Sequence, residues 1–128
     1  MHWNQLSEDN TRALALADIM CGAACADSQF DESERIIVGA MLIKVLGVTS
    51  LPAEFEAHLL GFDGDKLNLV DAVARLGLDN DRDKKSVFKV VSEIVKVDDK
   101  IEKSERSYVT RLAKALGIHV AEVKSLLG

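Results

Sequence analysis

Apolar residues recur along this chain at spacings of three and four, with charged residues between the apolar stretches. This pattern is typical of α-helices that bury one face, because 3.6 residues make one helical turn. It predicts an all-α fold of about seven helices without a sheet. The expected helices cover about residues 10–26, 31–46, 53–60, 66–76, 81–97, 104–116 and 119–127.

The first expected helix is apolar around nearly its whole circumference. Between Ala13 and Ala26 only Asp18 is charged, so we expect this helix in the middle of the domain. Two interpretations of Asp18 stay open: its carboxylate faces solvent, or it pairs with Lys89. The stretch from Val87 to Val97 is rich in β-branched residues and would also suit a strand, but its spacing favours a helix.

Single residues mark several helix ends. Asp31 and Glu34 form a capping-box pattern at the start of the second helix. Pro52 suits the start of the third helix, and Gly47 and Gly77 are natural stops. We expect the second helix to bury some of Ile36, Ile37, Ala40, Met41 and Ile43. The fourth places Leu67, Val70, Val73, Ala74 and Leu76 largely on one side.

An acidic segment of nine residues occurs twice, 71 positions apart. Residues 26–34 read Ala-Asp-Ser-Gln-Phe-Asp-Glu-Ser-Glu, and residues 97–105 read Val-Asp-Asp-Lys-Ile-Glu-Lys-Ser-Glu. Similarity at a fixed separation is evidence of a repeated structural unit. It predicts one domain, 1–128, with repeat units at about 10–48 and 81–118 and a connector at 49–80.

Composition fits one globular domain and excludes some functions. The chain has 128 residues, of which 48% are hydrophobic and 29% charged, with a net charge of −5. This charge argues against nucleic acid as a partner. The longest apolar run, residues 36–43, is too short to span a bilayer. Residues 1–5 lack the charged start of a leader peptide, so we expect a cytoplasmic protein.

Charge is divided unevenly between the two halves. Residues 1–64 carry 10 acidic and 3 basic residues, whereas residues 65–128 carry 11 and 13. Such a polarised surface suits a protein partner or self-association. Lys84, Lys85 and Lys89 are the candidate partner-binding residues, for an acidic protein or, as a weaker alternative, an anionic membrane surface. The plainer interpretation is a solvated helix face.

Other reactive residues give no site. Cys21 and Cys25 are four apart on one helix, which fits buried thiols in a reducing compartment better than a disulfide or a zinc site. His2, His58 and His119 are scattered and fit surface or packing roles. Because no nucleophile lies beside an acid or base, we expect no enzyme activity.

The repeated pattern resembles that of the TerB-like family over about residues 14–127. The residues that carry the resemblance are an apolar helix, then Asp27…Phe30…Glu34, then a helix ending in Leu-Gly, all given again with Asp98…Ile101…Glu105. The resemblance implies an all-helical domain in the bacterial cytoplasm, associated with tellurite resistance and chemical stress. It also implies that the acidic residues bind a metal ion.

The acidic residues allow two interpretations. If Asp27, Glu34, Asp98 and Glu105 converge, four carboxylates would suit a hard divalent cation, Ca²⁺ or Mg²⁺. Alternatively they cap helices and form salt bridges, and the protein is a structural or dimerisation domain with no ligand. The sequence therefore predicts a non-enzymatic interaction module and leaves open whether this module also binds a metal ion.

Overall fold

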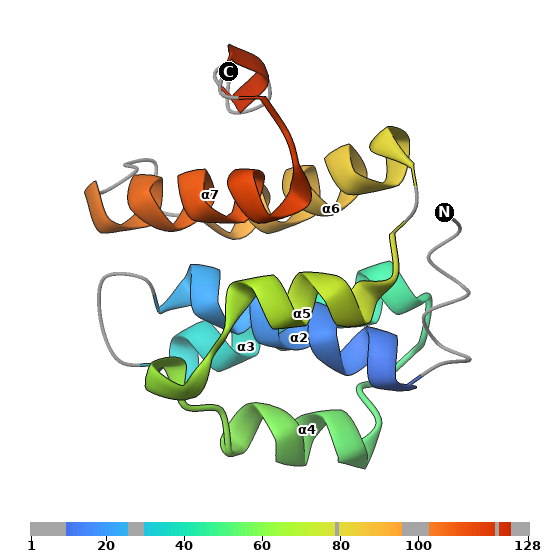
Figure 1. The fold of residues 1–128 in the computed structure, drawn as a ribbon. Helices are drawn as coiled ribbons and strands as arrows, with labels where there is room; N and C mark the ends of the chain where they lie inside the picture. Colours follow the sequence, from blue (N-terminus) through green and yellow to red (C-terminus); the bar gives the residue numbers. More distant parts are fainter. Residues whose placement is uncertain (1–9, 26–29, 79, 96–102, 120, 124–128) are drawn as a thin grey trace.

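The computed structural model describes residues 10–25, 30–78, 80–95, 103–119 and 121–123. Within these residues the fold is all-α and contains no strand, which confirms the expected fold class. The helices are α2 (Asn10–Ala24), α3 (Glu32–Leu46), α4 (Ala53–Leu60), the short 3₁₀ helix η1 (Gly64–Lys66), α5 (Leu69–Leu76), α6 (Asp81–Val95) and α7 (Lys103–Leu116) (Figure 1).

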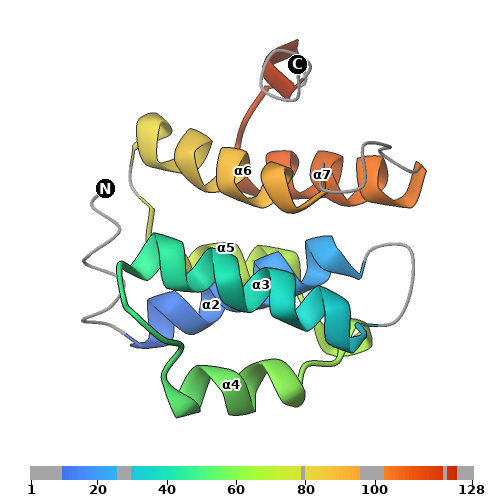
Figure 2. The ribbon, with the colours of Figure 1, turned by 180° about the vertical axis from the view of Figure 1, so that it is seen from behind.

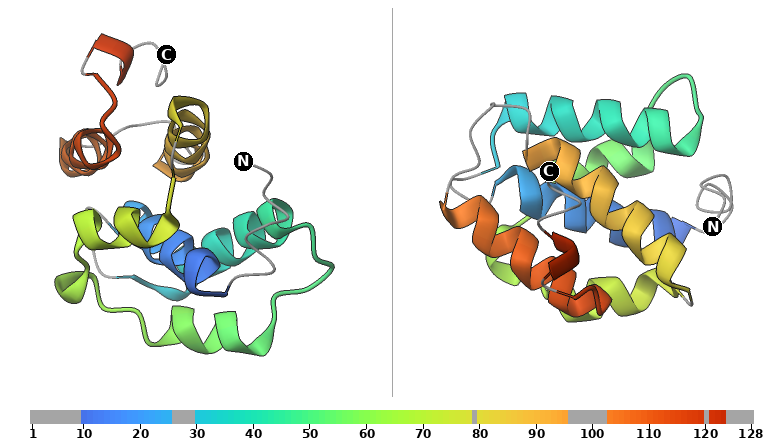
Figure 3. Two further views of the ribbon diagram at one scale, coloured as in Figure 1. Left: turned by 45° about the vertical axis from the view of Figure 1, so that its right-hand side comes forward. Right: turned by 90° about the horizontal axis from the view of Figure 1, so that it is seen from above.

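Helix α2 lies at the centre of the domain and contacts each of α3, α4, α5, α6 and α7. The hairpin of α6 and α7 covers one side of it, and α4 lies on the opposite side (Figures 1 and 2). Helices α3 and α5 lie to either side of α2 (Figure 3). The central place expected for this helix is confirmed, and no solvent reaches eight of its residues: Ala13, Ala15, Leu16, Ala17, Ile19, Met20, Cys21 and Ala23.

Local chemistry explains most helix ends. Asp31 Oδ1 accepts a hydrogen bond from Glu34 N at 2.9 Å, and Glu34 Oε1 accepts one from Asp31 N at 3.0 Å, so the predicted capping box is present. Helices α3 and α5 end at Gly47 (φ 70°) and Gly77 (φ 63°), in the left-handed region that glycine adopts without strain. Pro52 precedes α4, as expected.

The predicted start of the helix over residues 66–76 is wrong by about one turn. Asn68 Oδ1 accepts a hydrogen bond from Asp71 N at 3.0 Å, and α5 begins only at Leu69. An asparagine in this role satisfies an orphan backbone amide and fixes the helix start. The preceding residues Gly64–Lys66 form η1 instead.

Helix α7 is held against α2 by a tyrosine and a glycine. The Tyr108 hydroxyl is buried and donates a hydrogen bond to the Ile19 carbonyl oxygen at 2.7 Å. A Cβ atom at Gly22 would lie 2.5 Å from the Tyr108 hydroxyl oxygen and 2.5 Å from Leu67 Cδ2. Only glycine permits this approach. Burial also raises the pKa of Tyr108, so the phenol stays protonated and remains a donor.

The bounds of the helices agree with the separation of the repeated motifs. A shift of 71 positions carries Asn10–Ala24 onto Asp81–Val95, and it carries the first residue of α3 onto the first residue of α7. Helix α7 then ends one residue earlier than α3. The duplication itself stays a prediction, as do the proposed domain bounds. None of the helices in the described ranges is long and apolar enough to cross a membrane.

Candidate functional site

Helix α3 is apolar on all sides but is only partly covered. From Ile36 to Leu46 its one charged residue is Lys44. A helix of this composition is normally buried over most of its surface, as α2 is. The inner face of α3 is indeed buried, through Val38, Gly39, Leu42 and Leu46. Its outer face is left uncovered by the other described residues.

The expected burial of this outer face is therefore corrected. The Ile36 side chain is 64% exposed, Ala40 is exposed, and Ile37, Met41 and Ile43 are only half-buried. Since apolar residues surround the helix, periodicity could not show which side would face α2. On α5 the apolar residues are not all buried either: Val70 is 70% exposed, and Ala72 and Leu76 are the buried residues.

A groove of about 390 Å³ runs between the outer face of α3 and helix α4. Leu60 at its edge is 67% exposed, while Leu59 is buried in its floor. Exposed apolar surface of this kind marks contact sites more often than chance. The residues that line this α3–α4 groove are Arg35, Ile36, Gly39, Ala40, Ile43, Leu51, Glu56, Leu59 and Leu60.

Two charges of opposite sign border the groove. Arg35 comes from the first part of α3, and Glu56 from the first turn of α4. Neither side chain forms a salt bridge with another of the described residues. Both are therefore available to a molecule that enters the groove.

Of the four candidate metal ligands, the structure describes only the side chain of Glu34. Asp27, Asp98 and the Glu105 side chain lie outside the described residues. Glu34 holds the capping box, and hydrogen bonds from the Glu34 amide and then the Ser33 hydroxyl lower the pKa of Asp31. Oxygen ligands fit Ca²⁺ or Mg²⁺, but no group of three or more possible ligands gathers within the described residues.

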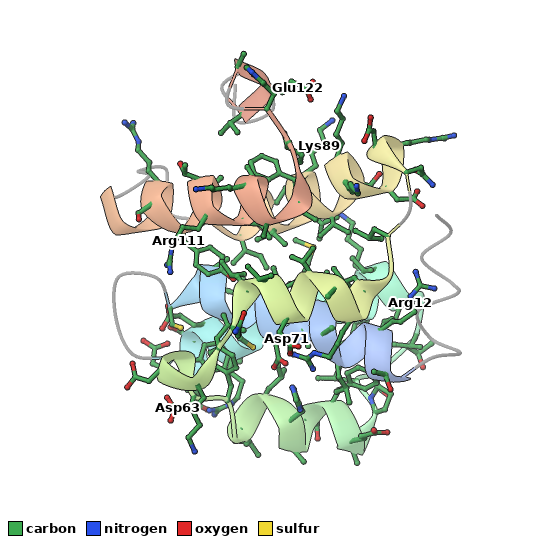
Figure 4. All side chains as sticks on the ribbon, in the orientation of Figure 1. Arg12, Asp63, Asp71, Lys89, Arg111 and Glu122 are labelled. Atoms are coloured by element: carbon green, nitrogen blue, oxygen red, sulfur yellow. The ribbon has the colours of Figure 1, made fainter. Side chains whose placement is uncertain are left out.

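The three candidate partner-binding lysines belong to α6, a helix that lies across α2 from α4. Lys85 Nζ forms a salt bridge with Glu122 Oε2 at 3.1 Å, so this lysine is already engaged. Lys84 is half-buried and Lys89 is exposed. Figure 4 shows Lys89 and Glu122 in the upper part of the molecule, remote from the groove. Their role in binding a partner stays a prediction.

Both interpretations of Asp18 are wrong. Its carboxylate is only 14% exposed and contacts His58 Nε2 at 2.6 Å and an Arg75 nitrogen at 3.5 Å. Arg75 Nε also contacts Asp71 at 3.2 Å. His58 comes from α4 and Arg75 from α5, and these residues, rather than Lys89, are the partners of Asp18. The partners lie 40 and 57 positions away, beyond what local spacing can reveal.

This polar cluster lines a pocket of about 420 Å³ that adjoins a larger one of about 640 Å³. In the larger pocket the rings of Phe30 and Phe62 meet edge to face, with centroids 5.5 Å apart. Cys25 lines this pocket, whereas Cys21 is fully buried in α2. Burial first, then Asp18 and Cys25, raises the pKa of Cys21, so this thiol is protonated and unreactive.

Comparisons with models of protein families, with curated proteins and with solved structures gave no match. The resemblance to the TerB-like family remains an expectation from the sequence.

Proposed function

We propose that this domain is a non-enzymatic interaction module of the TerB-like, stress-response type, and that its α3–α4 groove holds an apolar helical segment of a protein. The observation that carries the proposal is helix α3. Its outer face presents Ile36 and its neighbours to solvent, although its composition is that of a buried helix. Covering that face with a partner would remove apolar surface from water.

The shape and charge of the groove favour a helix over other ligands. Its apolar walls suit the side chains of an amphipathic helix, which binds such grooves through residues spaced three, four and seven apart. One arginine and one glutamate leave its border without net charge. An anionic membrane or a nucleic acid would instead require several basic residues.

Selection of peptides from a random display library on the purified domain tests this proposal. We expect helices with apolar residues at these spacings, and Ile36→Asp should abolish their binding. Val70 supplies the matched control, because it is equally exposed but lies on α5 outside the groove. Val70→Asp should leave binding unchanged. The proposal fails if the selected helices bind the Ile36→Asp variant as well as the unaltered protein.

A divalent cation is the second candidate ligand. The helix ends that adjoin both acidic segments lie at one end of the molecule, on the left of Figure 1, which supports convergence of the four carboxylates. If Asp27, Glu34, Asp98 and Glu105 do converge, a cation would relieve their repulsion. At a hundredfold excess over Kd it would stabilise the fold by about 2.7 kcal/mol.

Thermal melting in millimolar Ca²⁺ or Mg²⁺ tests the metal site. We expect the melting temperature to rise, and Asp98→Asn to abolish that rise. If the acids only cap helices, Glu105→Gln would be nearly neutral, because glutamine also serves in a capping box. Titration calorimetry that gave no heat with Ca²⁺, Mg²⁺, Mn²⁺ or Zn²⁺ would eliminate the site.

A further inference from the structure

The outer face of α3 has the form of the helix that its own groove would accept. Ile36, Ala40 and Ile43 lie at positions i, i+4 and i+7, which places them in one stripe along the helix. Apolar anchors at this spacing are typical of helices that bind in grooves. The same three residues form one wall of the α3–α4 groove. One surface therefore carries both the ligand helix and its receptor.

We propose that the occupant of the groove is a second copy of this chain, with α3 of each copy lying in the α3–α4 groove of the other about a two-fold axis. The inference rests on the proposed function and names its partner. In a two-fold contact the same patch is used by both copies, so the patch must be complementary to itself. The α3–α4 groove meets this condition in shape and in charge.

The shape offers both projections and recesses. Ile36 and Leu60 project into solvent, at 64% and 67% exposure. Between them Ala40 is small and exposed, and it leaves room for a neighbouring helix to approach. A Cβ atom at Gly39 would lie 3.6 Å from Leu51 Cδ2 and 4.0 Å from Leu59 Cδ1, so these two side chains of the lining already cover this glycine, and the open recess is the groove of about 390 Å³ beside them. Each copy can thus receive the projecting side chains of the other.

The charges are also complementary to themselves. A two-fold axis in the contact plane, perpendicular to the line from Arg35 to Glu56, places Arg35 of each copy opposite Glu56 of the other. Both salt bridges then form at once. A border with charges of one sign would set like charges against each other, and like charges across an interface are costly. A strongly acidic partner would place like charge against Glu56, and a strongly basic partner would place like charge against Arg35.

The charge border also gives a sharp experiment. Sedimentation velocity of the full chain, from micromolar to near-millimolar concentration, should show a monomer–dimer equilibrium. Ile36→Glu should weaken dimerisation about tenfold or more, since an apolar anchor is lost and a charge is placed in the contact. Val70 is a similarly exposed apolar residue outside the groove, so Val70→Glu should leave the dissociation constant of the dimer unchanged.

Exchange of the two charges separates a contact in the dimer from a general effect. Arg35→Glu alone and Glu56→Arg alone should each weaken the dimer, because each sets like charges opposite one another. The chain with both substitutions should regain it. Circular dichroism on every variant checks that the helices are intact, which we expect because Arg35 is half-buried and the other substituted positions are exposed.

Two results would overturn the inference: a chain that stays monomeric at all concentrations, or a dimer that survives both Ile36→Glu and Leu60→Glu. Failure of the inference is distinguishable from failure of the proposed function. A monomer that still binds display-selected helices through Ile36 overturns only the identity of the occupant. A monomer that binds no such helix overturns both.

Discussion

Replacement of Gly22 by alanine should lower the free energy of unfolding by about 1–3 kcal/mol, the usual cost of overfilling a packed contact. Replacement of Gly39 by alanine should raise it by about 0.5–1 kcal/mol, because alanine is the better residue inside a helix. The added methyl at Gly22 would meet the Tyr108 hydroxyl at 2.5 Å, whereas at Gly39 the nearest atom lies 3.6 Å away. Tyr108 cannot move aside without losing its hydrogen bond to Ile19.

Urea unfolding followed by circular dichroism measures both changes. Protein concentration should be low enough to keep the chain monomeric, because Gly39 lines the α3–α4 groove. Tyr108→Phe in the Gly22→Ala background should recover part of the loss, since the clashing oxygen is removed. A stabilising effect of Gly22→Ala would contradict the close approach of α7 to α2.

Phe88→Ala should cost about 3–5 kcal/mol, as expected for a large aromatic side chain removed from a core. Among the described residues Phe88 is the largest fully buried side chain, and it lies on α6, where that helix covers α2. Domains of this kind are usually stable by only about 5–15 kcal/mol. The variant should therefore be close to unfolding at room temperature.

The neighbouring residue supplies the control. Lys89 is exposed, so Lys89→Ala should change stability by less than about 0.5 kcal/mol. Val87, Phe88, Val91 and Ile94 are buried apolar residues of α6. We therefore expect stability to be sensitive to substitution at Val87 as well as at the adjacent Phe88. A loss below about 1 kcal/mol for Phe88→Ala would contradict the packing of α6 on α2.

The sequence predicted those features that one residue or one spacing determines. Pro52 placed the start of α4, Gly47 and Gly77 placed two helix ends, and Asp31 with Glu34 specified a capping box. Spacings of three and four distinguished helix from strand in α6, despite its β-branched residues. Each of these signals acts within a few residues, so the local structure that it predicts does not depend on which helices pack together.

Features that depend on which helices meet could not be predicted in this way. Both α2 and α3 are apolar on all sides, but only one helix can occupy the centre. The exposed face of α3 was therefore assigned to the core. Asp18 was missed for a similar reason, because His58 and Arg75 reach it from two other helices. The groove itself exists only once α4 lies beside α3.

Glu34, the one motif acid whose side chain the structure describes, contributes to a helix cap. Its carboxylate accepts the Asp31 amide hydrogen at 3.0 Å, a contact that needs no cation. The remaining motif acids, Asp27, Asp98 and Glu105, stay candidates for a cation and are addressed by the Asp98→Asn titration. The α3–α4 groove is lined by residues between Arg35 and Leu60, and the contact proposed there requires no cation.

Methyl NMR of isoleucine-labelled protein tests most directly whether the outer face of α3 is a contact surface. Ile36 and Ile43 report on the groove, and Ile19, fully buried in α2, serves as the internal reference. We predict that the Ile36 and Ile43 signals shift as protein concentration rises, and again when a display-selected helix is added, while the Ile19 signal stays in place. Ile36 and Ile43 signals that stay in place under both conditions would contradict the assignment of this face as a contact surface.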